Sequence, residues 1–174
     1  SSDLATGNEN QPLYERGLAV ERIRAARKAI DDFGLPVVLT ARCEAWLVGD
    51  ATPFKTSMNR LVAYAEAGAD CLFAPGIREP NQISDLVKEV HPKPVNVIVS
   101  SSNSELSFSQ LSDLGVRRIS VGSALARIAW AEFMKVSRGI AETGNFASLG
   151  NAATFSEINN IFTRKTPAMG TSKT

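Results

Sequence analysis

An arginine and a glutamate follow directly on an apolar run in residues 35–49, LPVVLTARCEAWLVG. An unbroken run of apolar and β-branched residues is typical of a strand buried on both faces. Arg42, at the carboxyl end of such a strand, could hold a carboxylate, phosphonate or phosphate through two parallel hydrogen bonds. Glu44 lies on the same side of an extended chain and could orient the guanidinium or a metal-bound water. A structural ion pair at the rim of the sheet is the alternative, and the residues leave both interpretations open.

Polar residues follow three further strand-like runs. In parallel α/β proteins, ligands bind outside the carboxyl ends of the strands, so these residues are candidates for the same site. They are residues 75–78, residues 100–103, and the pair Gly122 and Ser123. The hydroxyl and N–H groups of SSSNS and VGS suit phosphate, although serine-rich loops are commonly only solvated. We predict that Ser100 contributes to substrate binding.

Composition argues against several classes of partner. The 174 residues carry a net charge of +1, which suggests neither nucleic acid nor a membrane surface, whereas a small anion needs only one or two arginines. No apolar run is long enough to span a bilayer and no secretory signal opens the sequence, so we expect a cytoplasmic protein.

Cys43 and Cys71 lie in apolar runs without metal-ligand spacing and are predicted to be buried thiols. His91 is predicted to be a solvated loop residue.

Amphipathic helices alternate with short β-rich runs between Leu18 and Ile140, which favours a parallel sheet. Helices begin at signals such as Thr52 with Pro53, and they end at glycines such as Gly68. We expect helices over about 18–33, 53–67, 80–90, 108–114 and 125–140, and strands over 36–42, 69–76, 93–100 and 116–122. The residues predicted to face inward are all apolar, and they include Phe54, Met58, Leu61, Val62 and Ala65 of the second helix, Ile83, Leu86, Val87 and Val90 of the third, Leu125, Ala129, Phe133, Val136 and Ile140 of the long helix, and Phe155, Ile158 and Phe162 of the short terminal helix.

The number of strands decides the fold class. A complete (β/α)₈ barrel usually needs roughly 250 residues, and this chain has only four strand-like runs. We therefore predict the C-terminal half of a (β/α)₈ TIM barrel over residues 1–142, beginning after the fourth strand; a small open doubly wound sheet is the alternative. Residues 143–153 are predicted to be a linker, 154–164 a packing helix opened by a capping box of Thr154 and Glu157, and 165–174 a flexible tail.

Five ordered blocks resemble the isocitrate lyase and phosphoenolpyruvate mutase superfamily. The likeness is closest to the phosphoenolpyruvate mutase-like branch, which includes carboxyphosphonoenolpyruvate mutase-like proteins, and it covers roughly residues 5–140. The last helix is similar to the family's last helix, which is exchanged between subunits, so the extra C-terminal helix is expected to be swapped. The blocks are PLYERGLAVERIRAARKA, LPVVLTARCEAWLVG, RLVAYAEAGADCLFAPGI, KPVNVIV and LGVRRISVGSALARIAW.

The resemblance implies a barrel that forms a homodimer or homotetramer and binds Mg²⁺ with a small anionic 2-oxo acid or phosphonate. Such enzymes make or break a C–C or C–P bond through enolate-like charge that the metal stabilises. Arg42 matches the family arginine that binds the substrate's acidic group, and Glu44 matches the acid of the same motif; both are implied to be catalytic. SSDLATG places Asp3 at the glutamate that supports the metal, and Leu4 stands where the family has an aspartate.

Two departures bear on the reaction that the resemblance implies. Pro75 stands where lyases acting on isocitrate or methylisocitrate carry a glutamate, and Ile98 stands near their asparagine. Both changes favour the mutase, hydrolase or decarboxylase members. The family's main metal-binding aspartates and gating loop belong to the first half of the barrel and have no counterpart here, so the sequence is a piece of a longer enzyme or the protein has lost the chemistry.

Three functions follow as hypotheses. The leading one is a Mg²⁺-dependent phosphoenolpyruvate mutase-like enzyme of the phosphonomutase, hydrolase or oxo-acid lyase type. The alternative is a non-catalytic half barrel that acts through self-association, because exposed edges of a parallel sheet seek partners. A third is a phosphate-binding barrel of sugar or indole metabolism, which would use the loops between Ser100 and Ser123.

Overall fold

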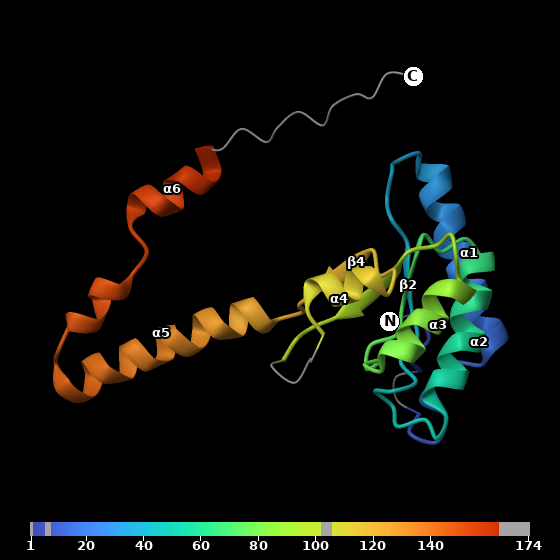
Figure 1. The fold of residues 1–174 in the computed structure, drawn as a ribbon, viewed down its shortest axis with the longest axis horizontal. Helices are drawn as coiled ribbons and strands as arrows, with labels where there is room; N and C mark the ends of the chain where they lie inside the picture. Colours follow the sequence, from blue (N-terminus) through green and yellow to red (C-terminus); the bar gives the residue numbers. More distant parts are fainter. Residues whose placement is uncertain (1, 6–7, 102–105, 164–174) are drawn as a thin grey trace. The chain divides into compact units, whose positions relative to one another are not determined.

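The computed structural model describes residues 2–5, 8–101 and 106–163, and the chain divides into two compact units, Ser1–Leu125 and Ala126–Thr174 (Figure 1). Helices alternate with strands through the first unit, as the sequence predicts. In chain order its elements are α1 (Arg16–Phe33), β1 (Thr40–Arg42), α2 (Pro53–Glu66), β2 (Cys71–Phe73), α3 (Pro80–Glu89), β3 (Val95–Ile98), α4 (Phe108–Asp113), β4 (Arg118–Ser120) and the start of α5 (Ala124–Thr143).

The four strands form one parallel sheet in the order β1-β2-β3-β4. The predicted α/β class with a parallel sheet is therefore confirmed. Register aligns Arg42 with Phe73, Phe73 with Asn96, and Asn96 with Arg118, so one residue of each strand stands in a row across the sheet. Partners in register point to the same face, which places Arg42 on the face that carries Phe73.

A hydrogen bond between the two edge strands shows that this sheet is curved. Arg118 Nη1 of β4 donates to Thr40 Oγ1 of β1 at 2.9 Å. Three strand spacings in a flat sheet would separate these strands by about 14 Å, farther than an arginine side chain reaches. The face that carries Arg42 is therefore concave, as the inner face of a barrel is.

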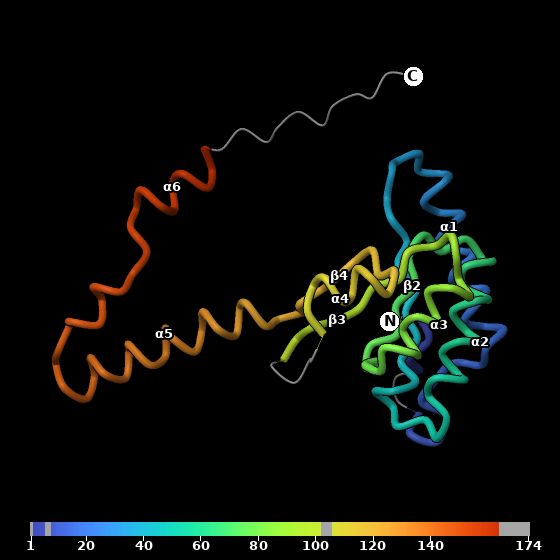
Figure 2. The backbone as a smooth tube through the Cα atoms, in the orientation of Figure 1, coloured from blue at the N-terminus to red at the C-terminus, as the bar shows by residue number. Residues whose placement is uncertain are grey.

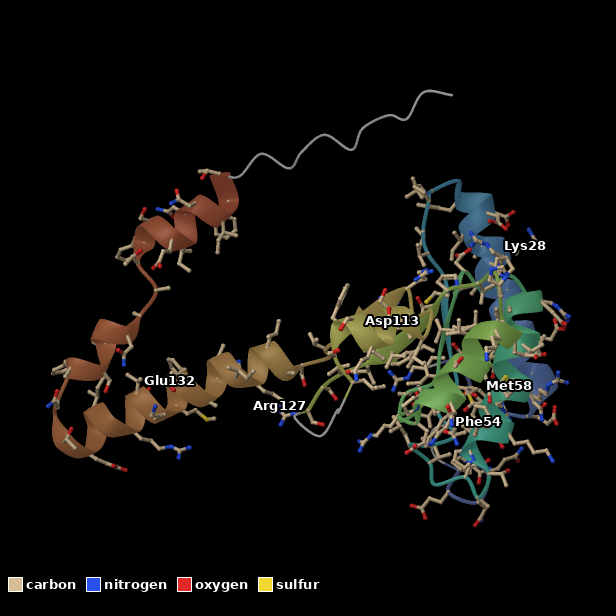
Figure 3. All side chains as sticks on the ribbon, viewed as in Figure 1. Lys28, Phe54, Met58, Asp113, Arg127 and Glu132 are labelled. Carbon is tan, nitrogen blue, oxygen red and sulfur yellow. The ribbon has the colours of Figure 1, made fainter. Side chains whose placement is uncertain are left out.

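Helices α1, α2 and α3 lie side by side, with α2 in contact with both neighbours and with β1 and β2 (Figure 2). Ile83 and Leu86, three positions apart on α3, share its buried face, as predicted. Leu61 of α2 is fully buried, whereas Phe54 and Met58 are only partly covered. Figure 3 labels the side chains of Phe54 and Met58 on this helix. On α4, Leu111 is buried, whereas Phe108 is 78% exposed.

The first strand is shorter and less buried than the sequence predicts. The expected strand of residues 36–42 is reduced to Thr40–Arg42, and Leu35, Val37 and Val38 are exposed, the last by 67%. β1 is an edge strand with β2 as its only strand neighbour in the described part of the chain. The apolar residues 35–39 therefore lie outside the strand, and the prediction that this run is a strand buried on both faces is wrong. Burial on both faces needs a neighbouring strand on each side.

Helix α2 begins and ends at the predicted residues, with one difference in the cap. Thr52 is the N-cap residue, yet its side chain makes no capping hydrogen bond; Asp50 Oδ1 instead accepts from the Thr52 N–H at 2.7 Å. Pro53 occupies the first turn. Beyond the helix, Gly68 has a φ of 102°, the left-handed conformation expected for a residue after a helix end.

The second unit contains most of α5, a short 3₁₀ helix (Ala147–Asn151) inside the predicted linker, and α6 (Phe155–Thr163). The predicted capping box is confirmed: Thr154 Oγ1 accepts from the Glu157 N–H, and Glu157 accepts from the Thr154 N–H at 2.7 Å. Hydrogen bonds from Thr154 lower the pKa of Glu157; the larger contribution comes from the backbone N–H and the smaller one from the hydroxyl. The predicted tail, 165–174, lies outside the described residues.

Within this unit, the helices do not bury apolar side chains against each other. No residue of α5 or α6 is buried, although the sequence predicts an inward face on both helices. Nor is any described helix both long and apolar enough to cross a membrane. The exposed apolar residues of the two helices include Leu125, Ile128, Trp130, Phe133, Met134, Phe155, Ile158, Ile161 and Phe162.

Candidate anion-binding site

Arg42 and Glu44 form a two-point ion pair at the carboxyl end of β1. Arg42 Nε donates to Glu44 Oε1 at 2.5 Å, and Arg42 Nη2 donates to Glu44 Oε2 at 3.0 Å. The Glu44 side chain is 5% exposed and the Arg42 side chain 34% exposed. On its other side the guanidinium lies over the ring of Phe73, 5.0 Å from the centroid. The predicted pairing of these residues is present, and it fixes the guanidinium from two directions.

A pocket of about 500 Å³ lies at the carboxyl ends of the strands, a size within the range that suits small ligands. Arg42 lines it from β1, residues 75–78 line it from the segment after β2, and Ser100 and Ser101 line it from the segment after β3. The structure therefore brings together predicted candidates that follow three different strands. Gly122 and Ser123 do not line this pocket, and residues 102 and 103 lie outside the described ranges.

The amino-terminal residues Ser2 and Asp3 lie against the exposed edge of β1. Ser2 Oγ accepts a hydrogen bond from the Arg42 N–H at 2.8 Å, and Asp3 Oδ1 accepts from the Glu44 N–H at 3.1 Å. The N–H of the intervening Cys43 points the other way and donates to the Phe73 carbonyl of β2. Alternate N–H groups of an edge strand face away from the sheet, so two side chains here take the place of a neighbouring strand.

Asp3 is completely buried, and helix α2 provides it with one hydrogen bond and one ion pair. Tyr64 Oη donates to Asp3 Oδ2 at 3.1 Å, and Arg60 Nη1 lies 3.5 Å from the same oxygen. Arg60 is held in turn by the Tyr14 carbonyl, to which its Nη2 donates at 2.8 Å. A buried carboxylate needs such donors and a countercharge, and Asp3 has both.

These contacts bear on the metal site that the family resemblance implies. Both carboxylate oxygens of Asp3 already accept from protein donors, and the next residue, Leu4, has no ligand atom in its side chain. Within residues 2–5, 8–101 and 106–163, no group of three or more His, Cys, Asp or Glu side chains is arranged to hold a metal ion. The described residues alone therefore do not form a metal site, and the assignment of Asp3 to a metal stays a prediction.

Sequence reasoning missed the polar face of α2. Ser57 and Tyr64 are buried, and Arg60 lies between them on the same side of the helix, whereas the predicted inward face was entirely apolar. Burial raises the pKa of Tyr64 well above its ordinary value, so its hydroxyl stays protonated and able to donate. The signal that could have identified this face is the recurrence of polar residues at spacings of three and four positions.

Both cysteines are buried free thiols, as predicted. Burial is the largest cause that raises the pKa of Cys43 from 9.0 to about 12, followed by the negative charge of Asp3. A protonated thiol shielded from solvent is a poor nucleophile, which fits a packing role for Cys43. His91, also as predicted, lies in an exposed turn between α3 and β3.

We expect neither cysteine to react with iodoacetamide in the folded chain near pH 8, because only an accessible thiolate is alkylated at a useful rate. In denaturant both should react readily, because both thiols are then accessible and Cys43 regains the ordinary thiol pKa of 9.0. Mass spectrometry of protein labelled with and without urea measures the difference. Labelling of Cys43 at equal rates under both conditions would contradict its burial.

A curved parallel sheet with helices between its strands, and with a pocket beside the strand ends, is the arrangement of part of an α/β barrel. The comparison with protein families makes this assignment specific. The model of the family "phosphoenolpyruvate phosphomutase" matches residues 2–141, and the chain belongs to this family, within the phosphoenolpyruvate mutase/isocitrate lyase superfamily. The predicted family is thereby confirmed.

Solved structures agree with the family. A provisionally assigned lyase/mutase from Burkholderia cenocepacia J2315 is 40% identical, with a TM-score of 0.81 over 92% of this chain and 57% of that one. A provisionally assigned phosphonomutase from the same organism is 32% identical, with a TM-score of 0.62 over 78% and 54% of the two chains. A 2,3-dimethylmalate lyase is 24% identical and shows the fold alone, with a TM-score of 0.69 over 79% and 49%. This chain spans about half the length of these proteins, so it is a partial barrel, as predicted.

Proposed function

We propose that this chain supplies the anion-binding part of an enzyme that makes or breaks a C–C or C–P bond of a 2-oxo acid or phosphonate. The observation that carries the proposal is the orientation of Arg42, which Glu44 and Phe73 fix at the pocket. Family membership and the likeness to a lyase/mutase and a phosphonomutase support the reaction type. Both relatives are longer than this chain, so the activity is proposed for the gene product that contains it.

In this proposal Arg42 holds the acidic group of the substrate. The pair with Glu44 occupies Nε and one hydrogen of Nη2, and the partly exposed guanidinium has further N–H donors for a ligand oxygen. Glu44 keeps the fork in one orientation, which lowers the entropy that binding must remove. Ser100, exposed at the same pocket, offers a hydroxyl to a second oxygen of the anion. Apolar side chains such as Ile77 and Val97 limit the access of water.

The cofactor proposed is Mg²⁺, following the family resemblance. Its chemistry would be stabilisation of enolate-like charge on the substrate. No step of the proposal depends on a metal ligand in the described residues, where none is arranged for that purpose. We also propose a homodimer or homotetramer in the cytoplasm, with no nucleic acid or membrane as partner.

The test is an assay of the purified gene product with phosphonopyruvate and oxaloacetate, each with Mg²⁺ and with EDTA. Turnover of either acid that stops with EDTA would support the proposal. Absence of metal-dependent turnover of both acids would contradict it.

One observation favours the alternative of self-association without catalysis. Leu35, Val37 and Val38 are exposed on the segment that leads into an edge strand, where a partner could cover them. Sedimentation of the 174-residue chain tests this alternative, since a well-folded monomer would speak against it.

A further inference from the structure

We propose that Tyr64 is a positioning residue for Arg42, which it reaches through Asp3 and Glu44. Tyr64 Oη donates to Asp3 Oδ2 at 3.1 Å, and Asp3 Oδ1 accepts from the Glu44 N–H at 3.1 Å. The Glu44 carboxylate then accepts both hydrogen bonds from Arg42. Hydrogen bonds through four residues thus connect helix α2 to the guanidinium at the pocket, and the backbone N–H of Glu44 is one of the links. The role in substrate binding rests on the proposed function, whereas the role in holding the ion pair does not.

The need for this support follows from the position of Glu44. Glu44 lies beyond the last residue of β1, at the start of a turn, where the Leu47 N–H donates to its carbonyl at 2.8 Å. Its own N–H faces the open edge of the sheet, and Asp3 provides the acceptor for it. A shift of Asp3 would therefore move the backbone of Glu44, and with it the carboxylate that orients Arg42.

Asp3 is itself held by α2. Two groups of this helix, the Tyr64 hydroxyl and the Arg60 guanidinium, converge on the single oxygen Oδ2. They also contact each other, since Arg60 Nη1 donates to Tyr64 Oη at 3.4 Å. Arg60 supplies the countercharge for Asp3, whereas Tyr64 fixes the orientation of the Asp3 carboxylate. A hydrogen bond from a hydroxyl constrains this orientation more narrowly than an ion pair at 3.5 Å does.

Tyr64 is the residue to change, because Tyr64→Phe removes one oxygen and leaves a fully buried ring in place. Removal of Arg60 would instead leave the buried Asp3 without a countercharge and would threaten folding. Ser57→Ala provides the matched control. Ser57 is also buried on α2, but its hydroxyl donates to Cys43 Sγ at 3.5 Å. Both variants remove a buried hydroxyl from the same helix, and only one of these hydroxyls touches Asp3.

The first measurement is amide hydrogen exchange of the full 174-residue chain. Exchange at the Glu44 N–H should be at least about tenfold faster in Tyr64→Phe, since a hydrogen bond to a charged group contributes a factor of this size or more. The Leu72 N–H, bonded within the sheet to the Pro94 carbonyl, reports any loss of overall stability. Ser57→Ala should leave the ratio of the two rates unchanged. An unchanged ratio in Tyr64→Phe would overturn the proposal.

The second measurement is the affinity of the gene product for oxalate, a small dianion, by calorimetry. We expect Tyr64→Phe to weaken binding by about fivefold to tenfold, an effect in the range of one lost hydrogen bond. In an Arg42→Lys background, which lacks the guanidinium fork, the same change should have little effect. Equal losses in both backgrounds, or no loss in either, would overturn the positioning role.

The two measurements separate this proposal from the proposed function. If the unsubstituted protein does not bind oxalate, the anion site of the proposed function is lost, and the exchange ratio at Glu44 still decides whether Tyr64 positions the ion pair. If oxalate binds and Tyr64→Phe changes neither affinity nor exchange, the positioning role fails while the anion site stands.

Discussion

Replacement of Arg42 by alanine is expected to lower kcat/KM of the gene product for its oxo acid or phosphonate by at least about 100-fold, or about 3 kcal/mol of transition-state stabilisation. Arg42 presents its guanidinium to the pocket in one fixed orientation, with Glu44 and Phe73 on two sides. An oriented charged donor of this kind stabilises charge that develops on the substrate without reorganisation during the reaction. Steady-state kinetics with phosphonopyruvate and oxaloacetate measure the effect.

The same substitution also affects stability, and a control must separate the two effects. Without Arg42, the carboxylate of Glu44, only 5% exposed, loses its paired charge. The double variant Arg42→Ala/Glu44→Gln removes this buried charge, so its melting temperature should return toward that of the unsubstituted protein. Its activity should stay low, because the donor to the substrate is still missing.

The double variant decides between the two interpretations that the sequence leaves open for this pair. Recovery of stability without recovery of activity identifies Arg42 as the anion ligand. Recovery of both would mean that the pair is a structural ion pair of the rim, and the proposed function would lose its main support. Arg42→Lys should give an intermediate activity, because lysine keeps the charge but not the planar fork.

Local regularities explain which features could be predicted from the sequence. Helix periodicity locates Ile83 and Leu86 on one buried face, and alternation along an extended chain places Arg42 and Glu44 on one side. The rule that ligands bind at the carboxyl ends of parallel strands brings Ser100 to the same pocket as Arg42. Each inference uses residues close in sequence, or a rule that fixes where distant segments meet.

Features that depend on contacts between distant segments of the chain could not be predicted from the sequence. Asp3 and Tyr64 are 61 positions apart, and neither spacing nor composition indicates that they share a hydrogen bond. The exposure of Val38 was missed for a related reason. An apolar run shows that a strand is suited to burial, while the number of neighbouring strands depends on parts of the sheet that the run does not encode.

Substitution of Gly76 is expected to lower the stability of the protein strongly. Gly76 lies in the pocket wall between β2 and α3. Its φ is 102°, and a Cβ at this position would lie 2.5 Å from the Cβ of Trp46. Gly76→Ala therefore combines backbone strain with a clash against the turn that follows Glu44. We expect a loss of about 3 kcal/mol or more in the free energy of unfolding, which includes about 1–2 kcal/mol of strain.

A substitution at Gly49 distinguishes the effect of backbone strain from the effect of the clash with Trp46. The φ of Gly49 is 72°, but a Cβ there would meet nothing within 4 Å. Gly49→Ala should consequently lose only the strain term of about 1–2 kcal/mol. Urea unfolding of both variants, followed by tryptophan fluorescence, measures the difference, and equal losses would show that Trp46 moves aside without cost. Because Trp46 belongs to the turn that begins at Glu44, a displaced Trp46 should also disturb the Arg42 pair. Oxalate affinity should therefore fall in Gly76→Ala and stay unchanged in Gly49→Ala.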